Sequence, residues 1–409
     1  MSFQQGLSGL NAASKNLDVI GHNIANANTT GMKASRAEFA ELYANAMGSA
    51  GGINQGIGVE VATVSQQFTQ GNLSVTGRSL DVAINGNGFF QIDQPNGMRA
   101  YTRDGSFKLT KDGQIVTNDG GSLLGITASP DGVIPTGGVI GPLILPAGGE
   151  IKADRSTQLD VRFNLDASAE IPTGTAPAAL TPPIETYGTS AVGYNSLGTA
   201  VPISIYFTKT ANNTWDVWTS VDGAAMVNSG TMTFGNDGEL VTPNPPTLTA
   251  LNVAESDGTL FPVTFNLERA TQYGSSRFSV TKAITDGQAS GKLTAINIDD
   301  SGVVLGVYSN GKTLAAGQIQ LATFTNEQGL SPIGGNLWMA TPASGLEPTA
   351  TGVPGTGNIG VVRAGTLEDS NVDLTKELVN MMTAQRTYQA NAQTIKTQDQ
   401  VLNTILNIR

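Results

Sequence analysis

The chain has 409 residues, a formal net charge of −11, 50 glycines and no cysteine, and only 13% of its residues are charged. This length is sufficient for two to four domains, each with a core of its own. The acidic balance, without any run of five basic residues, argues against nucleic-acid binding and against an anionic membrane surface, and the absence of cysteine excludes disulfides and thiolate metal sites.

The first predicted element is a helix over residues 1–28. Its large apolar residues recur every seven positions, which is typical of the narrow seam of a coiled coil rather than a broad core-facing stripe. The full heptad line contains Phe3, Leu10, Leu17 and Ile24, and a weaker line begins at Leu7. A polar cluster that includes Asn26, Asn28 and Gly31 is expected to end this helix.

The same N-terminal residues show no basic segment followed by an apolar one, so no secretory signal peptide is expected. No run of residues approaches the roughly 18 apolar positions of a membrane helix, so membrane insertion is not expected either. Residues 31–70 have a mixed pattern and are predicted to be a connector, in which residues 48–58 are small and flexible.

From about residue 71 to 365 the sequence has almost no helical period. Short alternating runs are separated by Asn-Gly and Asp-Gly pairs, which favour the positive φ angles of tight hairpins. Asp112-Gly113, between two apolar runs, is the clearest of these signals, and residues 215–218 predict a further strand. This part is therefore predicted to be all-β, with surface loops at the Pro- and Thr-rich residues 171–183 and 242–250.

The last predicted element is a long helix over residues 370–408, which Ser370, Asn371 or Asp373 could cap. One of its heptad lines contains Leu374, Met381, Tyr388, Ile395 and Leu402, and the other, mixed line includes Leu378 and Leu406. The remaining faces of both terminal helices are rich in Asn, Gln, Thr and Ser. Such helices either pack on the body of a globular protein, or pair with each other and with further copies of the chain.

The sequence gives little support for a catalytic site or a metal-binding site. His22 is the only histidine, whereas a catalytic triad or a zinc site usually needs more. Asp299 and Asp300 are adjacent, so on a strand their carboxylates would point to opposite faces, and a turn is the better interpretation. We therefore expect no enzyme activity, no catalytic, cofactor-binding or metal-binding residues, and no cofactor.

Two terminal motifs resemble those of a known family. Residues 23–33, which include Asn23, Asn26 and Asn28, look like the N-terminal signature of the flagellar axial proteins, the rod, hook and hook-associated subunits. His22 and Met32 are mild departures from that signature. Residues 370–374 and 385–391 resemble the C-terminal signature, and residues 81–90 are similar to the segment that follows the connector. Residues 145–285 carry no recognised signature.

The resemblance implies a nested architecture and a structural role. Because rod subunits typically lack so large a central insertion, the chain is most similar to the hook subunits. The implied fold is mainly β with α-helical termini: a terminal helical coiled-coil domain (1–30 with 366–409), the connector (31–70), and two nested β-barrel-like or β-sandwich-like domains, the inner at 71–145 with 285–365 and the outer at 146–284.

The resemblance also implies partners and a location. The expected partners are further copies of the chain in a helical polymer, the hook cap, the distal rod protein, the hook–filament junction protein and the flagellar type III export apparatus. The expected place is the extracellular hook of the bacterial flagellum, a flexible curved tube that transmits torque. The alternatives are a distal rod or hook-associated subunit, a β-rich surface adhesin, and a polysaccharide hydrolase, for which the sequence offers no converging carboxylates.

Overall fold

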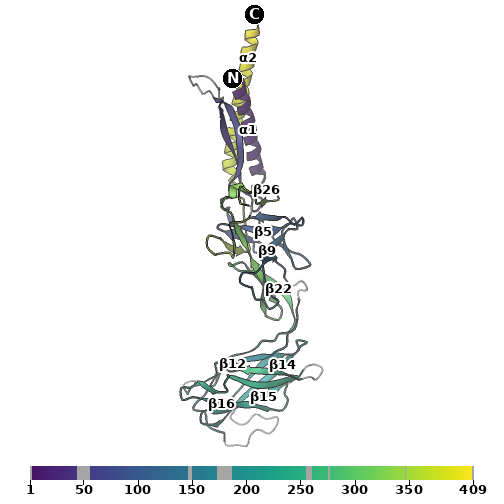
Figure 1. Cartoon of the computed structure of the whole chain (residues 1–409), viewed down its shortest axis with the longest axis vertical. Coiled ribbons are helices and arrows are strands. Elements are labelled where there is room, and N and C mark those ends of the chain that lie inside the picture. Colours follow the sequence, from purple (N-terminus) through teal and green to yellow (C-terminus); the bar gives the residue numbers. More distant parts are fainter. Residues whose placement is uncertain are drawn as a thin grey trace. The chain divides into compact units, whose positions relative to one another are not determined.

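The computed structural model describes residues 2–43, 56–145, 150–172, 187–254, 260–274, 277–345 and 347–407. The fold is mainly β with one long helix near each end of the chain, as predicted (Figure 1). The chain divides into two compact units. The first contains Met1–Ala147, Ala295–Val307 and Thr313–Arg409, and the second contains Gly148–Thr294 and Tyr308–Lys312.

In the first unit the two helices are α1 (Ser2–Ala25) and α2 (Leu374–Asn407). The strands up to residue 145 are β1 (Ser35–Tyr43), β2 (Gly56–Gln66), β3 (Leu73–Val75), β4 (Val82–Asn85), β5 (Phe89–Asp93), β6 (Arg99–Thr102), β7 (Lys108–Leu109), β8 (Ile115–Val116), β9 (Ser122–Thr127) and β10 (Ile140–Pro142). The later elements are β24 (Thr313–Ile319), β25 (Leu321–Thr323), the 3₁₀ helix η1 (Glu327–Gly329), β26 (Ser331–Gly334), β27 (Leu337–Met339), β28 (Ala350–Gly352), β29 (Val361–Ala364) and β30 (Thr366–Glu368).

The main sheet of the first unit interleaves strands from the two halves of the chain. Its order is β24-β9-β5-β6-β27-β26, and β25 pairs with β5 and β28. Strands β4 and β3 pair with β29 and β30, which lead into α2. A cluster of aromatic side chains fills one part of the core, with Phe68, Phe89 and Trp338 in edge-to-face contact. Strands β3 and β4 of the N-terminal half therefore position the segment that leads into α2.

The second unit is a pair of five-stranded sheets. One has the order β18-β19-β12-β20, with β21 on β12, and the other has the order β13-β14-β15-β16-β17. The strands of these two sheets are β12 (Gln158–Leu165), β13 (Tyr187–Tyr194), β14 (Ala200–Ala211), β15 (Thr214–Val221), β16 (Val227–Phe234), β17 (Leu240–Thr242), β18 (Thr247–Ala254), β19 (Leu260–Asn266), β20 (Thr271–Gln272) and β21 (Ser279–Thr285). A further short strand of this unit, β11 (Glu150–Ile151), lies outside both sheets. The unit boundaries fall within β22 (Gly291–Ile298) and β23 (Val303–Tyr308).

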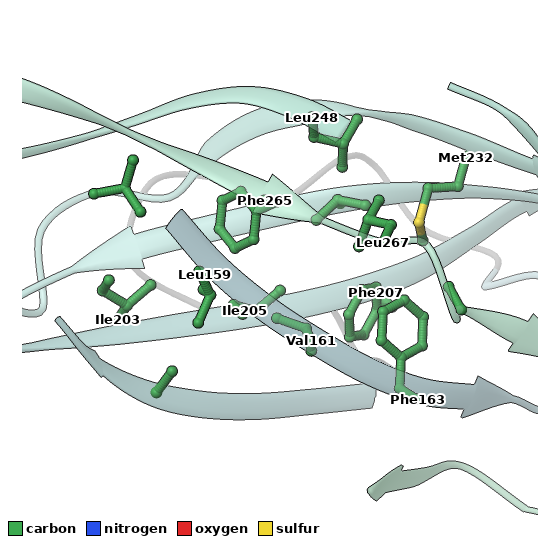
Figure 2. Close-up of a cluster of buried hydrophobic side chains, with 14 of the residues drawn as sticks. Leu159, Val161, Phe163, Ile203, Ile205, Phe207, Met232, Leu248, Phe265 and Leu267 are labelled. Carbon is green, nitrogen blue, oxygen red and sulfur yellow. The ribbon is translucent and has the colours of Figure 1, made fainter. Parts of the chain in front are cut away.

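The core of the second unit comes from strands of both sheets. Along β12 every second residue is buried, so one face of this strand turns Leu159, Val161 and Phe163 inward. Side chains of β14, β16, β18 and β19 pack in the same cluster (Figure 2). Burial of this apolar area gives the second unit a hydrophobic core of its own.

Several local predictions hold. Asp112-Gly113 connects β7 to β8, and the pairs Asn96-Gly97 and Asn310-Gly311 connect β5 to β6 and β23 to β24, with a positive φ at each glycine. Residues 215–218 lie in β15. The side chain of Asp299 accepts hydrogen bonds from Ser301 and Val303 in the predicted turn.

Two predictions need correction, and two fall on residues that are not described. The loop predicted at 242–250 is wrong in its second half, where β18 begins at Thr247 and buries Leu248 and Val253. The connector contains an antiparallel hairpin, β1 with β2, that the mixed pattern did not indicate. Residues 173–183 of one predicted loop, and residues 48–55 of the flexible stretch, lie outside the described parts of the chain.

Asp286 holds the beginning of β12 in the second unit. Its carboxylate accepts hydrogen bonds from the backbone N–H groups of Thr157 and Gln158, at 2.8 and 2.9 Å, and from the Thr157 hydroxyl. Burial acts to raise the pKa of Asp286, but these hydrogen bonds outweigh it and hold the pKa below its usual value. The carboxylate therefore stabilises the fold above its unfolded pKa of about 3.9, and this contribution is lost as the pH falls through the lower folded pKa.

We expect Asp286→Asn to lower the melting temperature of the second unit by about 2–4 °C at pH 7. The difference from the wild type should shrink as the pH falls below the unfolded pKa of about 3.9, and it should be gone once the pH is below the lower folded pKa, where the wild-type carboxylate is protonated as well. Thermal unfolding followed by circular dichroism at pH 7 and pH 3 measures this. An equal loss at pH 7 and pH 3 would mean that the charge of Asp286 contributes nothing.

Candidate assembly site

The two terminal helices pack against each other in antiparallel orientation (Figure 1). A Cβ atom at Gly6 would lie 3.1 Å from Cγ1 of Ile395, and one at Gly9 would lie 2.9 Å from the side chain of Asn391. The helices therefore approach closely because α1 has no side chain at these two positions. Farther along α1, Ala13 and Ile20 continue the line of Gly6 at intervals of seven residues, and both are buried.

In α1 this intrachain seam differs from the heptad lines read from the sequence, whereas in α2 it includes Ile395, a member of a predicted line. Of the predicted interface residues in α1, Phe3 and Leu7 are exposed, and Leu10, Leu17 and Ile24 are half-buried. In α2, Met381 and Ile395 are half-buried, whereas Leu374, Leu378, Tyr388 and Leu402 are exposed. The side chain of Leu406 is outside those described. The seam within one subunit thus leaves most of the predicted apolar lines uncovered.

The three predicted asparagines lie where α1 ends. The Asn23 side chain is buried and brackets Ser35, since its Oδ1 accepts from the Ser35 N–H at 2.9 Å and its Nδ2 donates to the Ser35 carbonyl at 2.7 Å. Asn26 donates from Nδ2 to the carbonyl of His22 at 3.0 Å, which closes the last turn of the helix. Asn28 is exposed in the turn that follows.

The hairpin of β1 and β2 lies along α1 and is held by polar contacts. Gln5 donates from Nε2 to the carbonyl of Gly56 at 2.7 Å, and the Val59 N–H donates to the hydroxyl of Ser8 at 3.3 Å. A groove of about 790 Å³ opens between α1, β1 and the first half of α2. Its lining mixes small apolar and amide side chains, such as those of Ala12, Asn16 and Ala384.

Asp373 is the cap of α2, and Asn371 ties the approach to α2 onto the N-terminal segment. The Asp373 carboxylate accepts from the N–H groups of Thr375 and Lys376, at 2.9 and 3.1 Å. Asn371 accepts from the Ala34 N–H at 2.7 Å and donates to the carbonyl of Gln67 at 2.7 Å. Of the three cap candidates in the sequence, the structure therefore selects Asp373 and gives Asn371 a different role.

A buried ionic cluster joins the helical end to the β-strands of the first unit. Lys33 donates from Nζ to Oε1 of Glu368 at 2.6 Å, and Nη1 of Arg103 lies 3.3 Å from Oε2 of the same carboxylate. The side chains of Lys33 and Glu368 are both 0% exposed. Burial lowers the pKa of Lys33 even though Glu368 acts to raise it, and burial raises the pKa of the nearby Glu327.

Sequence reasoning did not select Arg103 or Glu368 as site residues. Glu368 lies two positions before the C-terminal motif at 370–374, and Lys33 closes the N-terminal motif, so both lay at the edge of a recognised signal. Nothing near Arg103 in the sequence marks it. Within the described residues, no cluster of three His, Cys, Asp or Glu side chains could hold a metal ion, and no helix is long and apolar enough to cross a membrane.

Four family models match the chain in consecutive segments. They are "Flagella basal body rod protein" at residues 3–33, "Flagellar hook protein FlgE/F/G D1 domain" at 83–174, "Flagellar basal body protein FlaE D2 domain" at 164–288, and "Flagellar basal body rod FlgEFG protein C-terminal" at 363–408. The first and last of these matches coincide with the two terminal motifs.

Whole-length relatives agree with these matches. The chain is 41% identical to the flagellar hook protein FlgE of Escherichia coli (strain K12) over the full length of both, and 41% identical to that of Salmonella typhimurium, again over both full lengths. It is 32% identical to flagellar hook protein FlgE of Treponema pallidum, covering all of this chain and 99% of that one.

A solved structure shows the same fold at lower identity. The crystal structure of Helicobacter pylori flagellar hook protein FlgE2 is 15% identical in sequence, with a TM-score of 0.56, covering 72% of this chain and all of that one. The helical ends, the family matches and the full-length relatives agree, and this chain belongs to the family of flagellar hook proteins.

Proposed function

We propose that the chain polymerises through its helical end into the flexible curved tube of the flagellar hook, which joins the rod to the filament and transmits torque. The observation that carries this proposal is that several large apolar side chains on the two helices are exposed to solvent. Phe3 of α1 is 46% exposed, and Leu378 and Met382 of α2 are 47% and 54% exposed. Contiguous exposed apolar surface marks an interaction site more often than not.

The partner that suits these faces is a further copy of the chain. The heptad lines of Leu374, Met381, Ile395 and Leu402 are only partly used within one subunit, so contacts between copies would cover the remainder. A head-to-tail contact that does not close into a ring continues as a helical tube. We further propose that α1 and α2 are only partly ordered in the free subunit and gain order as copies join, as in coupled folding and binding, while the ionic cluster around Glu368 is already formed.

The two β regions would serve as the outer and more compliant part of the tube. Weakly charged, polar outer contacts can shift at small cost, whereas the packed helical layer cannot, since close-packed interiors resist deformation. This assignment follows the division expected from the sequence, with the helical ends at 1–30 and 366–409, the connector at 31–70, the inner β domain at 71–145 and 285–365, and the outer one at 146–284.

The further partners follow from the same role. We propose that the subunit leaves the cell unfolded through the flagellar type III export apparatus without a cleaved signal, which agrees with the absence of cysteine. It would then contact the hook cap, the distal rod protein and the hook–filament junction protein. In this role the chain is a structural component of the extracellular hook and has no enzyme activity.

The test is a substitution that places a charge on the exposed face of α2. We expect Leu378→Asp with Met382→Asp to raise the protein concentration needed for tube formation by at least about tenfold, because each buried Leu or Met side chain contributes about 1.5–3 kcal/mol to an interface. Electron microscopy and sedimentation of purified protein over a concentration series measure it.

Val139→Asp is the matched control, since Val139 is 89% exposed and lies in the β region of the first unit. It should leave the critical concentration nearly unchanged. If the α2 variant forms tubes at the wild-type concentration, the exposed face of α2 is not part of the interface. If the wild-type protein forms no tubes at any concentration, assembly through the chain alone is contradicted.

A further inference from the structure

Glu368 accepts hydrogen bonds from four donors in three segments of the first unit. Its Oε1 accepts from Nζ of Lys33 at 2.6 Å and from the N–H of Gly71 at 2.9 Å, and its Oε2 lies 3.3 Å from Nη1 of Arg103. Its backbone carbonyl accepts from the N–H of Gly31 at 2.8 Å. One residue of β30 therefore holds the segment after α1, the segment after β2, and the residue after β6.

Glu368 is the buried carboxylate that the two cations of this cluster share. Lys33 and Arg103 are both buried, and the second described partner of Lys33 is the carbonyl of Thr69, at 2.8 Å, which carries no net charge. The half-buried Glu327 is the other acidic group close enough to influence both cations. A buried ion pair adds little net stability, but removal of one partner leaves an uncompensated buried charge, which is strongly unfavourable.

We propose that Glu368 acts as a lock that couples the two ends of the chain, so that the segments around residues 31–34 and 69–71 can close only when β30 is in place. Three residues after Glu368, Asn371 bonds Ala34 and Gln67. The exit of α1 and the entry of α2 are thus fixed at one junction. The lock makes the order of the N-terminal end depend on the arrival of the C-terminal end.

The coupling of the two ends by Glu368 does not depend on the proposed function. Its consequence for assembly does rest on the proposed function. If both helices form the interface between copies, a chain whose C-terminal segment has not docked presents an unordered N-terminal end. Such a chain would not be competent to join a tube. Coupling of the two ends would therefore restrict assembly to subunits that are complete and correctly folded.

Native-state hydrogen exchange of the full chain tests the lock. In the wild type we expect the amides of Gly31, Ala34 and Gly71 to open together with that of Asp369, which donates to the carbonyl of Asn72. In Glu368→Gln the amides of Gly31, Ala34 and Gly71 should exchange roughly 10- to 100-fold faster, while the amides of the main sheet keep their protection, because two buried cations then lose the charge of their shared ion-pair partner. Unchanged protection, or the same increase at every amide of the first unit, would overturn the proposal.

Asp369→Asn is the matched control, because Asp369 is the adjacent exposed carboxylate and bonds only the hydroxyl of Ser74 among its described side-chain partners. This variant should leave the exchange rates of the Gly31 and Gly71 amides unchanged. Lys33→Met serves where Glu368→Gln does not fold. If the two charges are coupled, the double variant Lys33→Met with Glu368→Gln should raise the exchange rates by a factor smaller than the product of the two single factors. A factor equal to that product would contradict the coupling.

Tube formation by the same variants separates the two proposals. If Glu368→Gln uncouples the ends and raises the critical concentration for tubes about tenfold or more, lock and assembly are linked. If it uncouples the ends while tubes form as in the wild type, the lock stands and its proposed role in assembly is wrong.

Discussion

A chain that ends at Asp369 is expected to form no tubes at any concentration and to keep its β-rich body folded. The deletion removes α2, which supplies Ile395 and Asn391 opposite the two close-approach glycines of α1. Without α2 the remaining helix has 24 residues and one narrow apolar seam, and most of the stability of such a helix comes from packing. We therefore expect α1 to lose its helical structure as well.

The body should survive because its cores do not include α2. The buried members of the aromatic cluster in the first unit lie between positions 89 and 338, with Phe68 and Ala340 packed against them, and those of the core in the second unit lie between positions 159 and 270. The truncation also retains Glu368, so the ionic cluster can still form. Circular dichroism should show a loss of helix with the β signal preserved, and electron microscopy should show no tubes. Tubes formed by the truncated chain, or a body that unfolds, would contradict this prediction; an adhesin would in addition keep its target binding.

The parts of the fold that follow from local rules were predictable. Asn-Gly and Asp-Gly pairs determine a tight turn through the φ angles of two residues, so Asp112-Gly113 and Asn96-Gly97 placed hairpins correctly. The two helices were predicted to within a few residues because their apolar period extends over many turns. The hairpin of β1 and β2 was missed, since its mixed pattern lacks both signals.

The packing of the helical end was not predictable in the same way. A hydropathy pattern selects large apolar side chains, so it selected Leu10 and Leu17. The close contact in the structure is instead made where a side chain is absent, at Gly6 and Gly9, and such positions give no hydropathy signal. Glu368 was missed for another reason, since its partner Lys33 is 335 residues away and no local pattern connects them.

Gly31→Ala should destabilise the junction between the helical end and the β-strands by about 2–4 kcal/mol. Gly31 has a φ of +69°, which a residue with a side chain rarely adopts, and a Cβ atom there would lie 2.5 Å from the backbone nitrogen of Asp104. Because that contact is with backbone, no side chain can turn aside to relieve it. The residue before Asp104 is Arg103, so a displacement at this point moves a donor of Glu368.

Gly21→Ala is the matched control, and it separates the effect of the junction from a general effect of replacing glycine. Gly21 lies inside α1 with nothing within 4 Å of a Cβ atom, so alanine there should stabilise the helix by up to about 1 kcal/mol. Hydrogen exchange of β5 and of residues 31–34, with tube formation as a second readout, distinguishes the two variants. If Gly31→Ala were as well tolerated as Gly21→Ala, the backbone contact with Asp104 would not hold the junction. The path from α1 to the β-strands would then have to depend on the side chains of Asn23, Asn371 and Glu368 alone.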